Sequence, residues 1–135
     1  MVTKYFFCTL SLFLAFGVLS SSLPGCASSQ AKISSSPAVF QEGTLERAYN
    51  ASAGLLHEAV LSALKRLHLN VLDDRQDGQT MRIATKLGEG TPAEIGIDPV
   101  GPDTAKMRIY VGSSKDEAKA RTLLYAVESE LISRL

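Results

Sequence analysis

The chain has 135 residues, of which 45% are hydrophobic and 21% charged, a composition that fits one ordinary globular domain. Residues 1–25 differ from the rest, because they hold a single charge, Lys4, and five of the aromatic side chains. Without them, 13 Lys and Arg stand against 14 Asp and Glu, a net charge of −1. This balance excludes a strong field that would steer the protein to nucleic acid, so no nucleic-acid partner is expected.

Residues 1–25 have the three parts of an export signal. A short positive start ending at Lys4 is followed by an apolar run over residues 5–19 and by a small-residue exit over residues 20–26. The apolar run is shorter than the roughly 20 residues that a transmembrane helix needs. We therefore expect cleavage of this leader rather than a membrane span.

The exit reads Leu23-Pro24-Gly25-Cys26 and resembles the lipobox of bacterial lipoproteins. The resemblance implies cleavage before Cys26 and a diacylglyceryl group plus an amide-linked acyl chain on this cysteine, which anchor stably because each buried methylene contributes about 0.8 kcal/mol. Pro24 departs from the small or β-branched residues usual there, which bears on the efficiency of processing. The alternative is a plain signal peptide that is cut after Ala27.

The lipobox resemblance also implies a location. Lipidated at Cys26, the chain would face the periplasm from a membrane of the bacterial cell envelope, and Ala27 in place of Asp favours the outer membrane by resemblance to enterobacterial sorting. The other cysteine, Cys8, leaves with the leader, so no disulfide is expected in the mature chain. Residues 26–37, rich in serine, predict a flexible linker, and residues 38–135 predict a single α+β domain.

Hydrophobic periodicity predicts the elements of this domain in chain order. A weak strand over residues 44–50 precedes a helix that Ser52 caps and that continues to Leu67. Strands follow over residues 69–76, 79–87, 93–99 and 104–112, the first two joined by a tight Asp77-Gly78 turn. The last helix begins at Ser114, with Glu117 completing a capping box, and its apolar stripe runs to Leu135.

Alternation within the strands predicts one apolar face and one charged face of the sheet. Both helices carry one apolar stripe, so they are expected to cover the apolar face. The predicted fold is an α+β two-layer sandwich, an antiparallel sheet of four to five strands with two helices on one face, in the order β-α-β-β-β-β-α.

The domain also resembles a family of small bacterial lipoproteins known as domain of unknown function 3568. The resemblance rests on Tyr49-Asn50-Ala51-Ser52, on the segment from Ala63 to Leu67, and on Ile109-Tyr110-Val111-Gly112 leading into Asp116-Glu117-Ala118. It covers nearly the whole mature chain. It implies the fold and the compartment, and it brings no known activity.

Residues that could carry catalysis or bind a metal do not come together in the sequence. His57 and His68 lie eleven positions apart on one predicted helix, about 16 Å along its axis, and cannot share a metal. Lipid on Cys26 leaves no thiol for a nucleophile or a zinc site. The glycines of 88–90 suit a hairpin turn rather than a phosphate loop. The sequence therefore predicts no enzyme, no metal and no cofactor.

The charged face of the sheet is the predicted binding surface, and its ordinary interpretation is a solvated face. It carries four cations and an aromatic side chain that can stack on a ligand: Arg82, Lys86, Lys106, Arg108 and Tyr110. An anionic envelope component would suit the cations, although Glu94 and Asp98 on the same face weaken this interpretation.

Two functions are therefore weighed. The first is a non-enzymatic envelope lipoprotein whose sheet edge or open sheet face binds a protein partner. The alternative is a carrier of a small apolar or lipid ligand between helices and sheet. A cavity of roughly several hundred Å³ between the layers would support this alternative.

Overall fold

Six strands and two helices make up the part of the chain that the computed structural model describes, residues 35–112 and 116–135. The strands are β1 (Val39–Gln41), β2 (Thr44–Tyr49), β3 (Val71–Asp77), β4 (Thr80–Lys86), β5 (Pro92–Gly101) and β6 (Thr104–Val111). The helices are α1 (Ala53–Arg66) and α2 (Glu117–Ile132), and a short 3₁₀ turn, η1 (Gly88–Gly90), joins β4 to β5.

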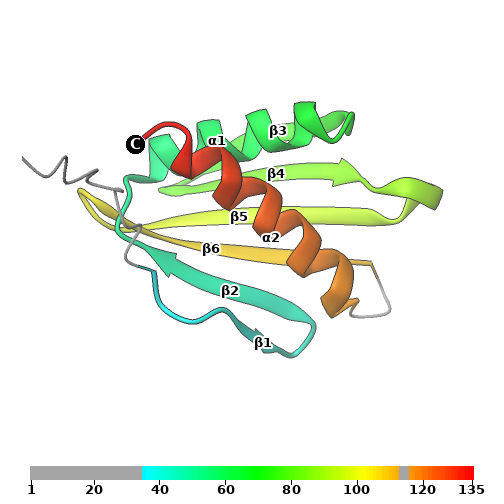
Figure 1. Cartoon of the computed structure of the whole chain (residues 1–135), viewed down its shortest axis with the longest axis horizontal. Helices are drawn as coiled ribbons and strands as arrows, with labels where there is room; N and C mark the ends of the chain where they lie inside the picture. The colour runs from blue at the N-terminus through cyan, green and yellow to red at the C-terminus, as the bar shows by residue number, and fades with distance from the viewer. Residues whose placement is uncertain (1–34, 113–115) are drawn as a thin grey trace, which may run out of the picture.

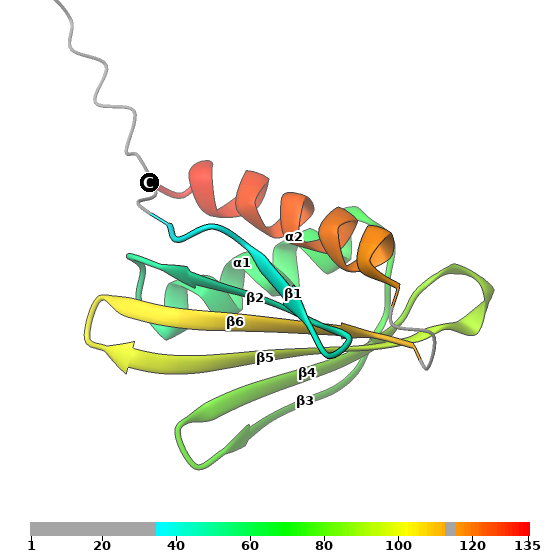
Figure 2. The same cartoon turned by 90° about the horizontal axis from the view of Figure 1, so that it is seen from below.

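The strands form one antiparallel sheet in the order β1-β2-β6-β5-β4-β3. Both helices lie on the same side of this sheet (Figures 1 and 2), where α2 packs on β2 and β6, and α1 packs on β5 and β6. The predicted α+β two-layer sandwich is confirmed. The sheet has six strands rather than four to five.

The core lies between the two layers and follows the periodicities of the sequence. Inward residues of the central strands, such as Ile95 and Ile109, are fully buried, as are Val60 of α1 and Val127 of α2. Burying an aliphatic side chain of this size contributes about 1.5–3 kcal/mol. These contacts hold both helices on one face, and no helix of the described residues covers the other face of the sheet, which is called the open face.

The strand β1 and its approach were not predicted. A two-residue turn at Glu42 and Gly43 joins β1 to β2, and both residues have positive φ angles, 52° and 83°, typical of a type I′ hairpin. Upstream of β1, Ser35 already pairs with Tyr49, and the amide of Ser36 donates to the carbonyl oxygen of Ala48 at 3.1 Å. The chain therefore joins the sheet before Ala38, where the domain was predicted to begin.

The helix caps agree with the prediction at α1 and differ at α2. The hydroxyl of Ser52 accepts a hydrogen bond from the amide of Leu55 at 3.3 Å, as predicted. The N-cap of α2 is Asp116 rather than Ser114, which lies outside the described residues. Its carboxylate accepts from the amide of Lys119 at 3.1 Å, and this bond holds the pKa of Asp116 below its usual value. The cap therefore stabilises the helix at pH values above the usual pKa of an aspartate, and this contribution is lost as the pH falls through the lowered pKa.

The C-terminal end of α2 also differs from the prediction. The helix ends at Ile132, and the side chain of Leu135, which was expected to extend the buried stripe, is exposed. Glu117, the first residue of α2, pairs with Arg121 at 2.7 Å, and the predicted capping box with Ser114 lies outside the described residues.

Candidate functional site

The uncovered face of the sheet carries a row of residues that the strand register places side by side. Arg82 on β4 lies opposite Gly96 on β5, and Gly96 lies opposite Arg108 on β6. Because neighbouring strands are about 4.8 Å apart, the backbones of the two arginines are separated by about 10 Å, with Gly96 midway. The row therefore consists of two long cationic side chains that flank a position without a side chain.

The cations of this face are paired with acids on adjacent strands. Arg82 Nη1 lies 3.1 Å from Glu94 Oε1, and Arg108 Nη2 lies 2.8 Å from Asp98 Oδ2. Exposed pairs of this kind stabilise a fold by about 1 kcal/mol at most, so their main effect here is on charge. Within each pair the positive and the negative charge largely cancel. The face therefore offers a balanced set of charges rather than a cationic patch.

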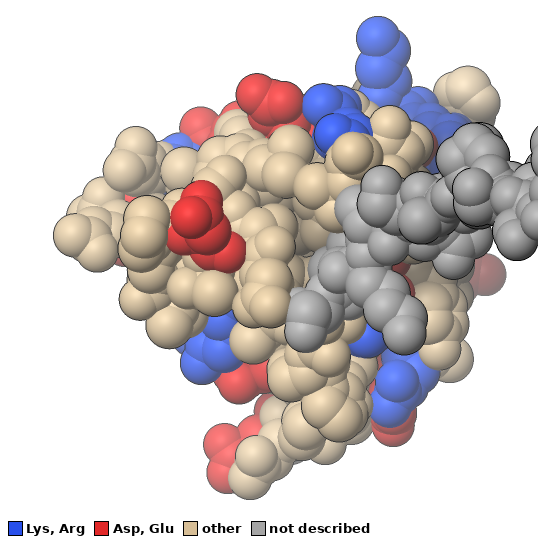
Figure 3. Space-filling view, turned by 60° about the vertical axis from the view of Figure 1, so that its left-hand side comes forward, with Lys and Arg blue, Asp and Glu red and all other residues tan. Residues whose placement is uncertain are grey.

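The remaining predicted cations lie farther from the centre of the face. Lys106 on β6 extends toward Glu46 on β2, with 3.5 Å between Nζ and Oε2. Lys86 is exposed at the end of β4, where it lies opposite Pro92. At the end of the molecule that carries the C-terminus, acidic and basic side chains both occur in small separate groups (Figure 3). Of the predicted binding residues, the structure brings Arg82, Arg108 and Tyr110 together.

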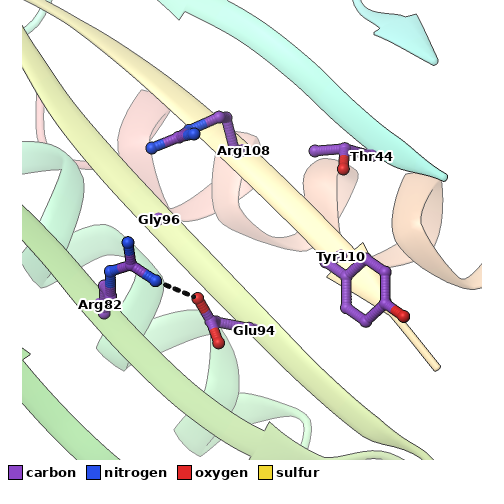
Figure 4. A pocket seen from close by; sticks show the side chains of 6 residues that line it. All are labelled: Thr44, Arg82, Glu94, Gly96, Arg108 and Tyr110. Atoms are coloured by element: carbon purple, nitrogen blue, oxygen red, sulfur yellow. Dashed lines mark hydrogen bonds and ion pairs between the residues drawn. The ribbon is translucent and has the colours of Figure 1, made fainter. Parts of the chain in front are cut away.

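A depression of about 140 Å³ lies over Gly96 on the open face (Figure 4). Its walls come from β2, β4, β5 and β6, and its lining residues are Thr44, Arg82, Glu94, Gly96, Arg108 and Tyr110. Tyr110 is 43% exposed, so its ring is open to contact from outside the domain. The depression is thus the place where the open face combines an aromatic ring, two guanidinium groups and bare backbone.

Packing within the chain does not require glycine at position 96. A Cβ built there would lie 3.9 Å from Nε and Nη2 of Arg108, an ordinary van der Waals distance. Glycine in a strand interior weakens the strand and often marks a place where another molecule approaches the backbone closely. Gly96 and Thr44 were not among the predicted binding residues. The available signal was Gly96 itself, a glycine at an outward position within an otherwise alternating strand.

A second hollow lies at the end of the domain where α1 ends and α2 begins. Four leucines and four smaller or polar residues line this groove of about 420 Å³: Leu67, Leu69, Leu87, Gly88, Glu89, Lys119, Thr122 and Leu123. The groove and Ser35 lie at opposite ends of the sheet. Ser35 pairs with the last residue of β2, which lies beside the first residues of β6, whereas α2 follows the last residues of β6. The groove is apolar and opens to solvent rather than lying between the layers.

A partly buried polar cluster joins β2 to α2. Glu128 Oε1 lies 2.6 Å from Arg47 Nη1 and accepts a hydrogen bond from the hydroxyl of Tyr49 at 2.8 Å. Burial first, and then the charge of Glu128, raise the pKa of Tyr49 well above its usual value. Arg47 also donates to the hydroxyl of Ser35 at 2.6 Å. The cluster therefore fixes the point at which the chain enters the domain. The carboxylate of Glu128 contacts both Arg47 and Tyr49.

The prediction that both histidines lie on one helix is correct for His57 and wrong for His68. His57 on α1 contacts Asp74 on β3 at 2.8 Å, whereas α1 ends at Arg66 and His68 follows it with a positive φ of 56°. Within residues 35–112 and 116–135, no three His, Cys, Asp or Glu side chains are grouped closely enough to hold a metal ion. No helix in the same described part is long and apolar enough to cross a membrane.

Comparison with protein families gives one match. Residues 9–130 match the family described as "Protein of unknown function (DUF3568)". The chain belongs to this family. The DUF3568 match includes all six strands and most of α2, so the fold described above is that of the family's domain in this chain. No curated protein matches the chain significantly.

The DUF3568 match also extends over the predicted lipobox. Leu23, Pro24, Gly25 and Cys26 all fall within the matched residues, but they lie outside the residues that the structure describes. Lipid attachment at Cys26 therefore stays a prediction from the sequence motif, and the geometry of the domain carries the argument about binding.

Proposed function

We propose that this DUF3568 protein is a lipid-anchored lipoprotein of the bacterial cell envelope that acts as a non-enzymatic interaction module for another envelope protein. The motif Leu23-Pro24-Gly25-Cys26 after an export-type leader supports the anchor. The same motif supports a position facing the periplasm, and Ala27 supports the outer membrane. Anchoring would hold the folded domain close to its partners in the envelope.

The observation that carries the proposed binding role is the uncovered face of the sheet. Both helices pack on the other side, so the outward side chains of β2, β4, β5 and β6 are free to meet another molecule. Arg82 and Arg108 are already paired with acids, which lowers the cost of removing their charges from water at an interface. Tyrosine and arginine are the side chains that most often anchor protein interfaces.

Site-specific photocrosslinking in intact envelopes tests this role. A photoreactive amino acid in place of Lys106, which is on the open face but outside the depression, is expected to give a discrete protein adduct. The same amino acid in place of Tyr125, which is 60% exposed on α2, is the matched control and is expected to give none. Identical adducts from both positions, or no adduct from Lys106, would contradict a partner on the open face.

A second candidate function is a carrier of a small apolar or lipid ligand, which the apolar groove would bind at the end of the domain instead of between the layers. The groove's volume of about 420 Å³ lies in the range of small-molecule sites, and four leucines line it. Native mass spectrometry of the protein released gently from envelopes would then show one bound lipid per chain. Leu67→Glu, at a residue that is 37% exposed, should release this lipid without unfolding the domain. Protein free of lipid would exclude the carrier.

A further inference from the structure

The spacing of Arg108 and Tyr110 suits a planar group between them. The two residues are separated by one position on β6 and share the open face, so their backbones are about 6.8 Å apart along the strand. Aromatic rings stack at centroid separations of about 4.5–7 Å, and a guanidinium group contacts a ring within about 6 Å. Both side chains line one depression, so a ring bound in it would lie beside both.

The ion pairs keep this gap open. The register places Asp98 opposite Lys106 and Glu94 opposite Tyr110, so Arg108 reaches away from Tyr110 when it pairs with Asp98. Asp98 accepts from Arg108 through both carboxylate oxygens, at 2.8 Å and 3.1 Å. With no side chain at Gly96, the floor beside the guanidinium group is backbone. The gap is thus formed before any ligand arrives.

The size and charge of the depression select an aromatic ring over an anion. Its volume of about 140 Å³ is close to the roughly 150 Å³ of an apolar protein cavity that holds one benzene. An added anion would meet Glu94 and Asp98 as well as the arginines, and it would gain little from charges that are already cancelled. The pair Arg82 and Glu94 at the rim can instead donate to or accept from a phenolic hydroxyl.

We propose that the depression over Gly96 is a receptor for one aromatic side chain, a tyrosine, of the protein partner. The ring would stack on Tyr110 and lie against the guanidinium group of Arg108, with its hydroxyl at the Arg82–Glu94 pair. This inference rests on the proposed function, because it names the group through which the partner docks. Tyrosine supplies a large, rigid contact area with a polar tip, which this half-polar depression matches.

Nuclear magnetic resonance with a small probe tests the receptor directly. N-acetyl-tyrosinamide is titrated into the purified full-length protein in dodecyl maltoside, and N-acetyl-leucinamide serves as the aliphatic match. The tyrosine probe is expected to give saturable shifts of the Tyr110 ring and of the Arg108 Nε–H signal. The leucine probe is expected to leave both signals in place.

Two variants make the result specific. Gly96→Val should weaken probe binding at least about tenfold, or about 1.4 kcal/mol, because its methyl groups occupy the depression while its Cβ fits the backbone. Ala84→Val adds the same kind of side chain to the neighbouring strand of the same face, outside the lining residues, and should leave binding unchanged. Equal binding by Gly96→Val and wild type would overturn the receptor, as would equal responses to the two probes.

The two proposals can fail separately. Probe binding that Gly96→Val abolishes, together with no protein adduct from Lys106, would support the ring site and overturn the protein partner. A discrete adduct from Lys106 without any probe binding would support the partner and overturn the ring site.

Discussion

Removing the carboxylate of Glu128 should destabilise the domain strongly, because this group on α2 bonds to two side chains of β2. Its Oε1 atom lies 2.6 Å from Arg47 and 2.8 Å from the hydroxyl of Tyr49. The variant Glu128→Ala leaves a guanidinium group and a hydroxyl without their acceptor beneath α2. The contact between Arg47 and Ser35 should weaken as well, because Arg47 loses the carboxylate that positions it.

The size of the effect follows from these contacts. A hydrogen bond to a charged group contributes about 1.5–3 kcal/mol. The ion pair, whose two side chains are 22% and 18% exposed, adds about 1 kcal/mol or less after screening by solvent. The free energy of unfolding should therefore fall by about 2–4 kcal/mol. For a domain of roughly 100 residues, this lowers Tm by on the order of 10–30 °C.

Thermal unfolding of the purified full-length protein, followed by circular dichroism at a helix wavelength, measures this change. Glu130→Ala is the matched control, because Glu130 is on the same helix and pairs with Arg66 at 3.2 Å near the surface. Its Tm should fall by only a few degrees. Equal and small shifts in both variants would refute the reasoning that Glu128 joins the two layers.

Three further outcomes are expected. Val127→Asp should unfold the domain, because an unpaired carboxylate would replace a fully buried side chain; a wild-type Tm would show that the stripe of α2 is not buried. Above about pH 10, stability should fall by up to about 1.4 kcal/mol per pH unit, since Tyr49, whose pKa is raised by burial, stays neutral when folded but ionises when unfolded. The contribution of Tyr49 to stability is fully present below about pH 10. The variant Tyr49→Phe should lack the alkaline loss of unfolding free energy, and an unchanged alkaline slope in this variant would contradict the prediction. Cys26→Ala should abolish metabolic acyl labelling and free the protein from membranes, and persistent labelling would exclude the predicted anchor.

The helices and the long strands could be predicted because their signals are local. Val60 and Val127 recur at helical spacing with their neighbours, and Ile95 and Ile97 alternate with polar residues. The strand β1 has only three residues, too few for a period, and it exists because Val39, Phe40 and Gln41 pair with β2. The turn residues Glu42 and Gly43 were the one local sign of it. The N-cap of α2 was predicted at the wrong residue, because serine and aspartate are both good N-cap residues and the pattern did not show that the helix begins at Glu117.

The candidate site was predictable in composition but not in arrangement. Alternation identifies which side chains share the open face, including Arg82, Arg108 and Tyr110. It does not reveal that Arg82 pairs with Glu94 and Arg108 with Asp98, because the register between strands determines which acid lies diagonally from which arginine. The gap at Gly96 likewise arises only when three strands are aligned. The sequence therefore predicts a face of mixed charge, and the structure adds the pairing of those charges and the depression between them.

Tyrosine footprinting in intact envelopes tests the central claim, a partner on the open face, most directly. Tyr110 on that face is 43% exposed and Tyr125 on α2 is 60% exposed in the isolated domain, so both should react with hydroxyl radicals in the purified protein. In the envelope, Tyr110 should become protected while Tyr125 keeps its reactivity, because the partner covers the open face alone. Equal reactivity of Tyr110 in the envelope and in the purified protein would contradict the claim.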